Sequence, residues 1–237
     1  MTNSLVTGAG HRLGRASALY LATRGHNVAV HYSTSEDAAL AVVADIKAMG
    51  RNAFAVQADL LIEADAQALV SRAAEQLGGP ILCLVNNAST FEHDTIETAS
   101  RNTWDHNMGS NLRAPFILTQ AMAAQDLPKR LDAEGEPIAV GLIVNMVDQR
   151  VRKLTPDFMT YTLAKMGLWA LTQTTARALA PNIRVNAIGP GPTLQNIRQS
   201  DEDFAKQRSA TVLKRGANLC DITAATSLKD TEALHKS

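Results

Sequence analysis

The residues most suited to chemistry are a tyrosine and a lysine four positions apart, Tyr161 and Lys165. Thr155 can cap a helix and Pro156 suits its first position, which predicts a helix over about 155–180 with the tyrosine in its second turn. That spacing places both side chains on one helical face. A phenol needs about 4 kcal/mol to titrate near pH 7, and an ammonium about 4 Å away can supply a similar amount. The pair can form a proton donor, although an isolated Tyr-x-x-x-Lys is more often a surface tyrosine and a solvated lysine.

The composition favours a globular protein that binds a small molecule. The chain has 237 residues, 46% hydrophobic and 19% charged, which suits one large α/β domain. Lys plus Arg equals Asp plus Glu at 23 each, so the charge does not predict nucleic acid or a membrane as partner. No apolar run reaches membrane-spanning length. Two cysteines, and six histidines without ligand spacing, predict no disulfide framework, no metal and a reducing cytoplasm.

A glycine-rich turn follows a short apolar strand expected at residues 3–7 and precedes a helix that runs to about residue 24. Strand, glycine turn and helix form the arrangement that binds a dinucleotide diphosphate at the helix N-terminus. Gly8 permits the tight turn, Gly10 lets a diphosphate approach, and Gly14 allows close helix packing. The spacing is one residue longer than the common fingerprint, and such loops often serve only as turns.

Hydroxyl groups stand where a dinucleotide-binding fold meets the adenosine ribose. The strand expected at 27–32 ends without an acidic residue and continues through Tyr32, Ser33, Thr34 and Ser35. No carboxylate would repel a 2′-phosphate there, and Arg12 lies in the glycine loop, so we expect NADP rather than NAD. The alternative is a polar loop in which Ser35 caps the next helix.

The remaining chain alternates apolar strands with amphipathic helices. Strands are expected at 53–57, 81–85, 138–146 and 183–188, and helices at 36–49, 63–77, 101–126 and 201–213. Such alternation predicts a Rossmann-type, doubly wound parallel sheet in a three-layer αβα arrangement, with a ligand at the C-terminal edge of the strands. Residues 129–137 are expected to form a polar loop.

Several strand ends carry residues suited to that ligand edge. Asp59 could accept a hydrogen bond from an adenine amino group or introduce the next helix. Residues 86–91 offer amides and leave room, and Asp148 follows the fifth strand. The turn 189–193 would lie beside the nicotinamide. Asn111 falls inside an expected helix, where asparagine is unfavourable, and this hints at a role.

With these residues assembled, the chain resembles the short-chain dehydrogenase/reductase family over about residues 3–225. The matching motifs occur in the family's order: Thr7-Gly8-x-x-x-x-x-Gly14, Asn86-Asn87-Ala88, Asn111, Tyr161-x-x-x-Lys165 and Pro190-Gly191. The resemblance implies a single dinucleotide-binding domain over 1–225. The tail, 226–237, is too polar for the family's usual seventh strand, so we expect the sheet to lack it.

Two departures from the family pattern resemble pteridine reductases. The middle glycine of the loop is Arg12, and the usual catalytic serine, thirteen residues before the tyrosine, is Asp148. Other features that fit this subgroup are His31-Tyr32, residues 57–60, residues 86–91 and Tyr161-Thr162-x-Ala164-Lys165. The resemblance implies an NADPH-dependent pteridine reductase, or a relative such as a dihydromonapterin reductase, that reduces a ring C=N bond.

The resemblance also implies roles for the site residues. Tyr161 supplies a proton with Asp148 beside it. Lys165 holds the ribose and lowers the pKa of Tyr161, and Asn111 orders a relay water. Phe91 stacks the pterin against the nicotinamide, or is merely a core residue. The implied substrate contacts are Arg12, Ser89, Phe91, Asp148 and Tyr161. The implied cofactor contacts are Gly8, Gly10, His11, Arg12, Leu13, Tyr32, Ser33, Thr34, Ser35, Asp59, Leu60, Asn87, Ala88, Lys165, Pro190 and Gly191.

Two other functions stay open. The first is a carbonyl or 3-oxoacyl-thioester reductase of the same family, for which a serine is expected at position 148. The second is an NADP-binding protein without turnover, against which Tyr161, Lys165 and Asn111 argue. A small-molecule substrate and a homo-oligomer are expected, whereas the sequence does not specify the substrate.

Overall fold

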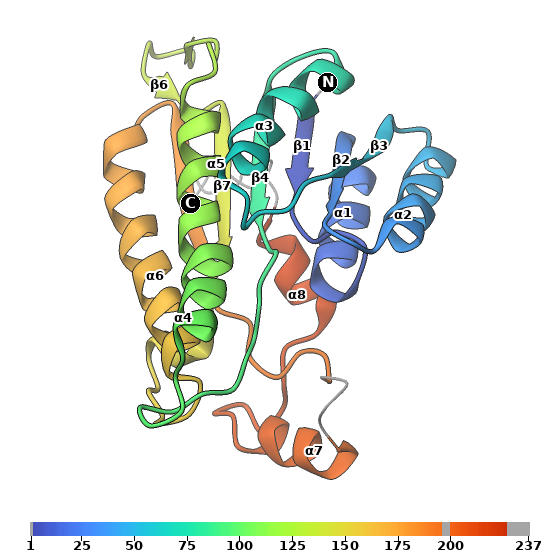
Figure 1. The fold of residues 1–237 in the computed structure, drawn as a ribbon. Coiled ribbons are helices and arrows are strands. Elements are labelled where there is room, and N and C mark those ends of the chain that lie inside the picture. Colours follow the sequence, from blue (N-terminus) through green and yellow to red (C-terminus); the bar gives the residue numbers. More distant parts are fainter. Residues whose placement is uncertain (1, 196–199, 227–237) are drawn as a thin grey trace.

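The computed structural model describes residues 2–195 and 200–226, and its centre is a six-stranded parallel sheet (Figure 1). The strands lie in the order β3-β2-β1-β4-β7-β8. Their bounds are Thr2–Val6 for β1, His26–Tyr32 for β2, Ala53–Gln57 for β3, Ile81–Asn86 for β4, Gly141–Met146 for β7 and Ile183–Ile188 for β8. The chain builds outward from β1 to β3 and then returns to the other side of β1, so the predicted doubly wound Rossmann-type sheet is confirmed.

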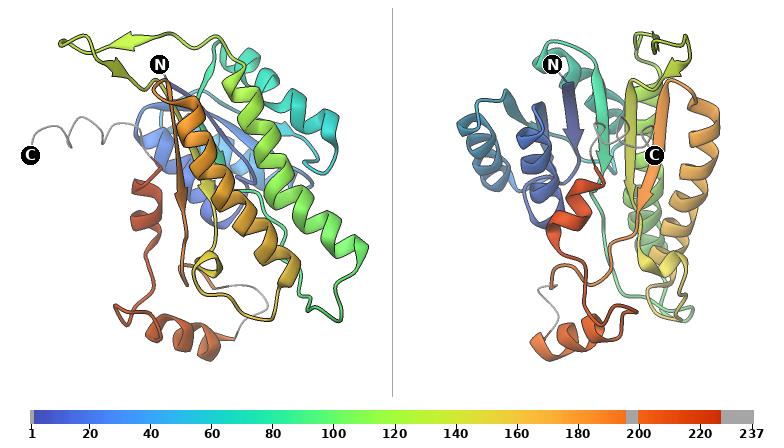
Figure 2. Two further views of the ribbon diagram at one scale, coloured as in Figure 1. Left: turned by 90° about the vertical axis from the view of Figure 1, so that its left-hand side faces the viewer. Right: turned by 180° about the vertical axis from the view of Figure 1, so that it is seen from behind.

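Helices cover both faces of this sheet (Figure 2). One face carries α1, Arg12–Thr23, α2, Glu36–Ala48, and the short α8, Leu219–Ala224. The other carries α3, Glu63–Leu77, α5, Ala114–Ala123, and α6, Met159–Leu179. Alternate strand residues enter opposite cores, as Leu84 and Val85 do, and both are fully buried. Burial on two faces explains the continuous apolar strand sequences.

Because the strands are parallel, the loops after all of them gather at one edge of the sheet. Two of these loops meet directly. The Arg12 guanidinium, at the start of α1, donates to the carbonyl oxygens of Gln195 at 2.6 Å and Leu194 at 3.0 Å in the segment after β8. This edge is therefore where the fold brings distant segments together, as the sequence predicted.

The start of α6 differs from the prediction. The helix begins at Met159, so Thr155 and Pro156 do not cap it, and Tyr161 lies in the first turn rather than the second. The residue before the helix, Phe158, has a left-handed backbone with φ 58°. The helix is instead capped from a distance, because the Thr160 N–H donates to a carboxylate oxygen of Asp94 at 3.1 Å.

Several other boundaries also differ from the predictions. The expected loop at 129–137 contains a hairpin of β5, Arg130–Leu131, and β6, Pro137–Ile138, organised by Asp132, whose Oδ1 accepts from the N–H groups of Glu134 and Glu136. The expected helix at 101–126 divides into α4, Arg101–Met108, a π-helix, Gly109–Arg113, and α5. Helix α7 spans Asp201–Ser209 and ends before residue 213.

Thr226, the first residue of the predicted polar tail, packs against the sheet. It is fully buried, and its carbonyl oxygen lies 3.9 Å from Cys83 Sγ in β4. Its neighbour α8 packs on α1 and places Ile222 in the core. The rest of the predicted tail, 227–237, lies outside the described residues. Within those that are described, the sheet has six strands.

Candidate active site

Three of the predicted catalytic side chains meet where β7 ends and α6 begins. The Tyr161 hydroxyl donates to Oδ2 of Asp148 at 3.0 Å. The Lys165 ammonium donates to the Met146 carbonyl at 2.8 Å and lies 5.6 Å from the centre of the Tyr161 ring. Tyr161 and Lys165 are both buried. The four-residue spacing thus brings the lysine to the face of the tyrosine ring, while the carboxylate faces the hydroxyl.

Burial shifts the pKa of both the tyrosine and the lysine. Burial, followed by the Asp148 carboxylate, raises the pKa of Tyr161 well above its ordinary value, and Arg150 and Ser89 oppose this only in part. Burial also lowers the pKa of Lys165 to about 8, against the effect of Asp148. The net shift of the Tyr161 pKa is upward, and Lys165 is not among the groups that cause it, so the role of Lys165 in lowering that pKa stays a prediction. At neutral pH the site presents a protonated phenol, which suits a proton donor better than a base.

Asn111 lies fully buried in the π-helix. Its side-chain amide donates to the carbonyl oxygens of Thr90 and Asn107, both at 3.1 Å, and its Oδ1 accepts from Ser89 Oγ at 2.6 Å. A single wide turn inside an α-helix is frequent at functional sites. Here it lets the asparagine hold Ser89, a residue that influences the pKa of Tyr161. The role of Asn111 in ordering a water stays a prediction.

An aromatic stack lines the same region. The Phe91 ring lies 4.2 Å from that of Phe158 at an interplanar angle of 8°, and it meets Tyr161 edge-on at 4.8 Å. The Arg150 guanidinium lies 4.7 Å from the centre of the Phe158 ring. Phe91 is 36% exposed, so the alternative that it is a core residue is wrong. Its predicted stacking on a substrate is untested.

The glycine loop has the geometry that a dinucleotide requires. Gly8 has φ +61°, and a Cβ at Gly14 would lie 2.2 Å from the Gly8 carbonyl oxygen, so both positions need glycine. The side chain of Asn87 donates to the Thr7 carbonyl at 2.8 Å. The Thr7 hydroxyl accepts from the N–H groups of Asn87 and Ala88, each at 2.9 Å. These bonds fix the loop after β1 against the loop after β4 and leave the N-terminus of α1 facing the ligand edge.

The other predicted cofactor contacts lie on the neighbouring loops. Ser35 is the N-cap residue of α2 but makes no capping bond with its side chain, so the capping alternative is not realised. Asp59 accepts from the Leu61 N–H at 3.0 Å and therefore shapes the turn after β3. The remaining predicted contacts are exposed or half-buried, apart from buried Gly10 and Leu60: His11, Leu13, Tyr32, Ser33, Thr34, Pro190 and Gly191.

His31, in β2, supports the glycine loop and was not among the predicted site residues. Its Nδ1 accepts from the Gly8 N–H at 3.0 Å, and its Nε2 lies 3.1 Å from the Ala58 carbonyl oxygen. The first bond needs an unprotonated Nδ1, so the hydrogen is on Nε2. Burial lowers the pKa of His31 to about 4. The sequence signals were a polar residue within a buried strand and the resemblance of His31-Tyr32 to pteridine reductases.

The His31 bonds predict a loss of stability in acid. In the unfolded chain His31 binds a proton near pH 6.5, whereas in the folded protein it stays neutral down to about pH 4. The free energy of unfolding therefore falls as the pH drops through that window. We expect a contribution of about 2 kcal/mol to be lost by about pH 4.5. Urea unfolding at neutral pH and at this pH measures it. His31→Asn can keep an acceptor for Gly8 but does not titrate, so equal losses in both proteins would contradict the prediction.

The family model described as short chain dehydrogenase matches residues 2–206. The chain belongs to the short-chain dehydrogenase family. The 3-oxoacyl-[acyl-carrier-protein] reductase FabG of Staphylococcus aureus is 34% identical over 213 residues, which are 89% of this chain and 82% of that protein.

Solved structures of this family show the same fold. The FolM alternative dihydrofolate reductase 1 from Brucella canis, complexed with NADP, is 43% identical with a TM-score of 0.86 over 95% of this chain and 85% of that one. A short chain dehydrogenase from Burkholderia cenocepacia in complex with NADP is 31% identical with a TM-score of 0.82, over 94% and 88%. This short-chain dehydrogenase is therefore an NADP-dependent oxidoreductase, and its predicted cofactor is confirmed.

The structure also reports on the expected absences. Between residues 2 and 195 and between 200 and 226, no helix combines the length and apolarity that a membrane crossing requires. The same residues contain no group of three His, Cys, Asp or Glu side chains placed to hold a metal ion.

Proposed function

We propose that this oxidoreductase reduces a C=N bond of a pterin-type ring, with NADPH as the hydride source and Tyr161 as the proton donor. The observation that carries this proposal is the hydrogen bond of 3.0 Å from the Tyr161 hydroxyl to the Asp148 carboxylate. An ionised carboxylate only accepts hydrogen bonds. A pterin presents ring N–H and amino donors to such a group, whereas a ketone or thioester presents an acceptor oxygen. The name of the FolM relative, an alternative dihydrofolate reductase, supports the same substrate class.

The chemistry of the C=N bond suggests the order of events. NADPH, when bound, supplies the hydride. Addition of the hydride to the carbon of a C=N bond leaves an electron pair on the nitrogen and makes it basic, so protonation by Tyr161 is proposed to accompany or follow hydride addition. The raised pKa of Tyr161 keeps the phenol protonated for this step. The Lys165 ammonium, 5.6 Å from the ring centre, stabilises the phenolate that forms. Once the phenolate of Tyr161 has regained a proton, its hydroxyl donates to Asp148 again.

The neighbouring residues suit a planar substrate and the phosphates of NADPH. Phe91 offers a partly exposed aromatic ring for stacking, and Ser89 and Arg12 lie at the same edge of the sheet as contacts for substrate or phosphate. The Ser35 hydroxyl, which makes no capping bond, is proposed to contact the 2′-phosphate. Lys165 is proposed to hold the ribose.

The second candidate function is reduction of a carbonyl or 3-oxoacyl thioester. It is favoured by the 34% identity to a 3-oxoacyl-[acyl-carrier-protein] reductase. Such a substrate places an acceptor oxygen near the proton donor, where a second hydroxyl donor would stabilise the developing charge. Asp148 cannot donate when ionised, and this argues against the second candidate.

A substrate panel tests the proposal. NADPH oxidation is measured with dihydrobiopterin, dihydromonapterin, dihydrofolate and an acetoacetyl thioester. We expect kcat/KM for at least one pterin to exceed that for the thioester by about tenfold or more. Faster reduction of the thioester would favour the second candidate. Binding of NADPH without oxidation by any of the four would favour the binding protein without turnover.

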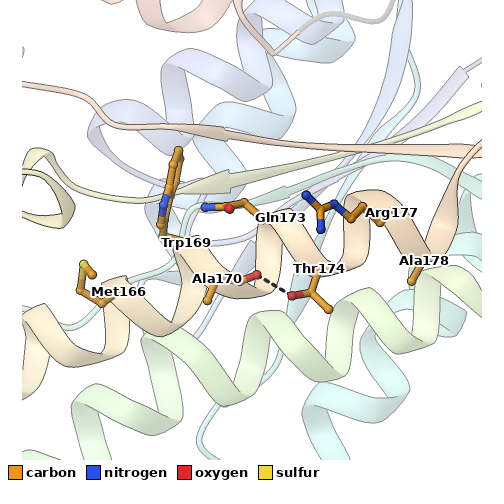
Figure 3. A pocket seen from close by; sticks show the side chains of 7 residues that line it. All are labelled: Met166, Trp169, Ala170, Gln173, Thr174, Arg177 and Ala178. Atoms are coloured by element: carbon orange, nitrogen blue, oxygen red, sulfur yellow. Dashed lines mark hydrogen bonds between the residues drawn. The ribbon is translucent and has the colours of Figure 1, made fainter.

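We also infer a homo-oligomer that forms through α6 and the α4–α5 region. A groove of about 560 Å³ follows α6, and Figure 3 shows the side chains along it. Its lining residues are Met166, Trp169, Ala170, Gln173, Thr174, Arg177 and Ala178. A second groove of about 500 Å³ lies on α4, the π-helix and α5, and includes Phe116, which is 37% exposed. The cytoplasmic location and the single domain over 1–225 stay predictions.

Charge placed on this face should separate the subunits. We expect Trp169→Glu to shift the protein to a 25.4 kDa monomer in light scattering, because a carboxylate would have to be buried at the contact. Leu40→Glu, on exposed α2, is the matched control and should leave the assembly intact. A parent protein that is already monomeric would contradict the inference.

A further inference from the structure

A buried carboxylate that the catalytic roles above do not use lies at the start of α6. Asp94 is 1% exposed. Its Oδ1 accepts from the Thr160 N–H at 3.1 Å, its Oδ2 accepts from the Thr160 hydroxyl at 2.5 Å, and its carbonyl oxygen accepts from the Met159 N–H at 3.3 Å. The first N–H groups of a helix have no partner within the helix, and a negative charge there is favourable. Asp94 therefore holds the turn that carries Tyr161.

A chain of hydrogen bonds extends from this carboxylate to the active site. The Thr160 hydroxyl accepts from Asn107 Nδ2 at 2.8 Å. The Oδ1 of Asn107 faces the Thr90 hydroxyl at 3.2 Å. Thr90 Oγ1 in turn lies 3.2 Å from Asn111 Nδ2, and Asn111 Oδ1 accepts from Ser89 Oγ at 2.6 Å. The chain begins at the residue next to Tyr161 and ends at Ser89, which also influences the tyrosine.

One group in this chain sets the direction of the bonds from Thr160 to Thr90. Hydroxyl and amide groups can each donate and accept, so the chain could run either way on its own. An ionised carboxylate has no hydrogen to donate, so Thr160 must donate to Asp94 and must accept from Asn107. The orientation of the Asn107 amide then fixes Thr90 as a donor. The Asn111 amide, whose Oδ1 accepts from Ser89, is oriented independently by its bonds to the carbonyl oxygens of Thr90 and Asn107.

We propose that Asp94 is a positioning residue for the proton donor. Its carboxylate holds the first turn of α6 and sets the direction of the hydrogen bonds from Thr160 to Thr90, which contacts Asn111. This inference rests on the proposed function, in which Tyr161 donates the proton. Asp94 touches neither substrate nor cofactor and acts through its neighbours.

Asp94→Asn keeps the size of the side chain but lets it donate to the Thr160 hydroxyl. The hydrogen bonds from Thr160 through Asn107 to Thr90 then reverse their direction. We expect kcat to fall by about 10- to 100-fold, on whichever panel substrate the parent reduces, while KM for NADPH stays the same. Glu97→Gln is the matched control, because Glu97 is an exposed carboxylate on the same segment and should keep full activity. Parental kcat in a folded Asp94→Asn variant would overturn the proposal.

A second substitution should make Thr90 a hydrogen-bond donor again. With Asn107→Asp added to Asp94→Asn, the Thr160 hydroxyl donates to the carboxylate at 107, accepts from the amide at 94, and leaves an acceptor facing Thr90. We expect this double variant to recover kcat to within about threefold of the parent. Asn107→Asp alone places two carboxylates against one hydroxyl and should lower kcat. A folded double variant that remains as slow as Asp94→Asn would overturn the proposal.

Two measurements keep the inference independent of folding and of turnover. If Asp94→Asn does not fold, Thr160→Val interrupts the chain while the Thr160 N–H bond to Asp94 remains, and kcat should fall equally. NMR contacts of the Asn107 amide protons should be to the Thr160 methyl group in the parent and to the Thr90 methyl group in Asp94→Asn. Unchanged contacts would overturn the assigned direction. A protein that reduces none of the panel substrates would contradict only the proposed function, because the NMR contacts can still be measured in it.

Discussion

Tyr161→Phe is expected to lower kcat for the preferred pterin by about 10²- to 10⁴-fold and to leave the affinity for NADPH unchanged. The substitution removes one hydroxyl, which donates to Asp148 Oδ2 at 3.0 Å, and keeps the ring that packs on Phe91. The loss therefore reports proton donation rather than packing. NADPH oxidation measures the rate, and quenching of protein fluorescence by NADPH measures the affinity.

Tyr20→Phe provides the matched control for that experiment, because Tyr20 lies in α1 and not among the catalytic side chains that meet at the start of α6. It should retain the parental kcat. An unchanged rate in Tyr161→Phe would remove this tyrosine from the mechanism and with it the proposed order of hydride and proton transfer. A loss of NADPH affinity in the variant would instead indicate that the Tyr161 hydroxyl helps to bind NADPH before the reaction.

Asp148→Ser is expected to change which substrate is preferred. The carboxylate accepts from Tyr161 and raises its pKa, and it offers no hydrogen to a carbonyl oxygen. A serine hydroxyl would join Tyr161 as a second donor to such an oxygen. We expect kcat/KM for dihydromonapterin or dihydrobiopterin to fall by about 100-fold and that for the acetoacetyl thioester to rise by about tenfold.

The fold should tolerate that exchange. Asp148 also accepts from the Arg150 N–H at 2.8 Å and so caps the 3₁₀ turn at Gln149–Val151. Serine is an equally good cap. The same four-substrate panel gives the ratio of kcat/KM values, with Asp148→Asn as a control that removes the charge but keeps the shape. A ratio that does not move in Asp148→Ser would mean that position 148 does not decide between the substrate classes.

The sequence by itself determined the sheet, the cofactor class and the meeting of the central side chains. Apolar strands alternating with amphipathic helices allow few arrangements other than a doubly wound parallel sheet, in which the residues after each strand share one edge. Asp148 follows β7, and Tyr161 and Lys165 share one helical face, so their convergence follows from local periodicity and topology. Glycine positions are similarly readable, because Gly8 needs a left-handed backbone.

Only the tertiary structure decided how tightly the proton is held and what holds its donor in place. The pKa of Tyr161 depends on burial and on the carboxylate of Asp148, thirteen residues away. The four-residue spacing of Tyr161 and Lys165 predicts neither effect. The start of α6 was misplaced because its cap is Asp94, 66 residues from Thr160, rather than the nearby Thr155. Local patterns report the hydrogen bonds that a segment can make with itself. Bonds to groups that folding brings from elsewhere are specified only by the packed chain.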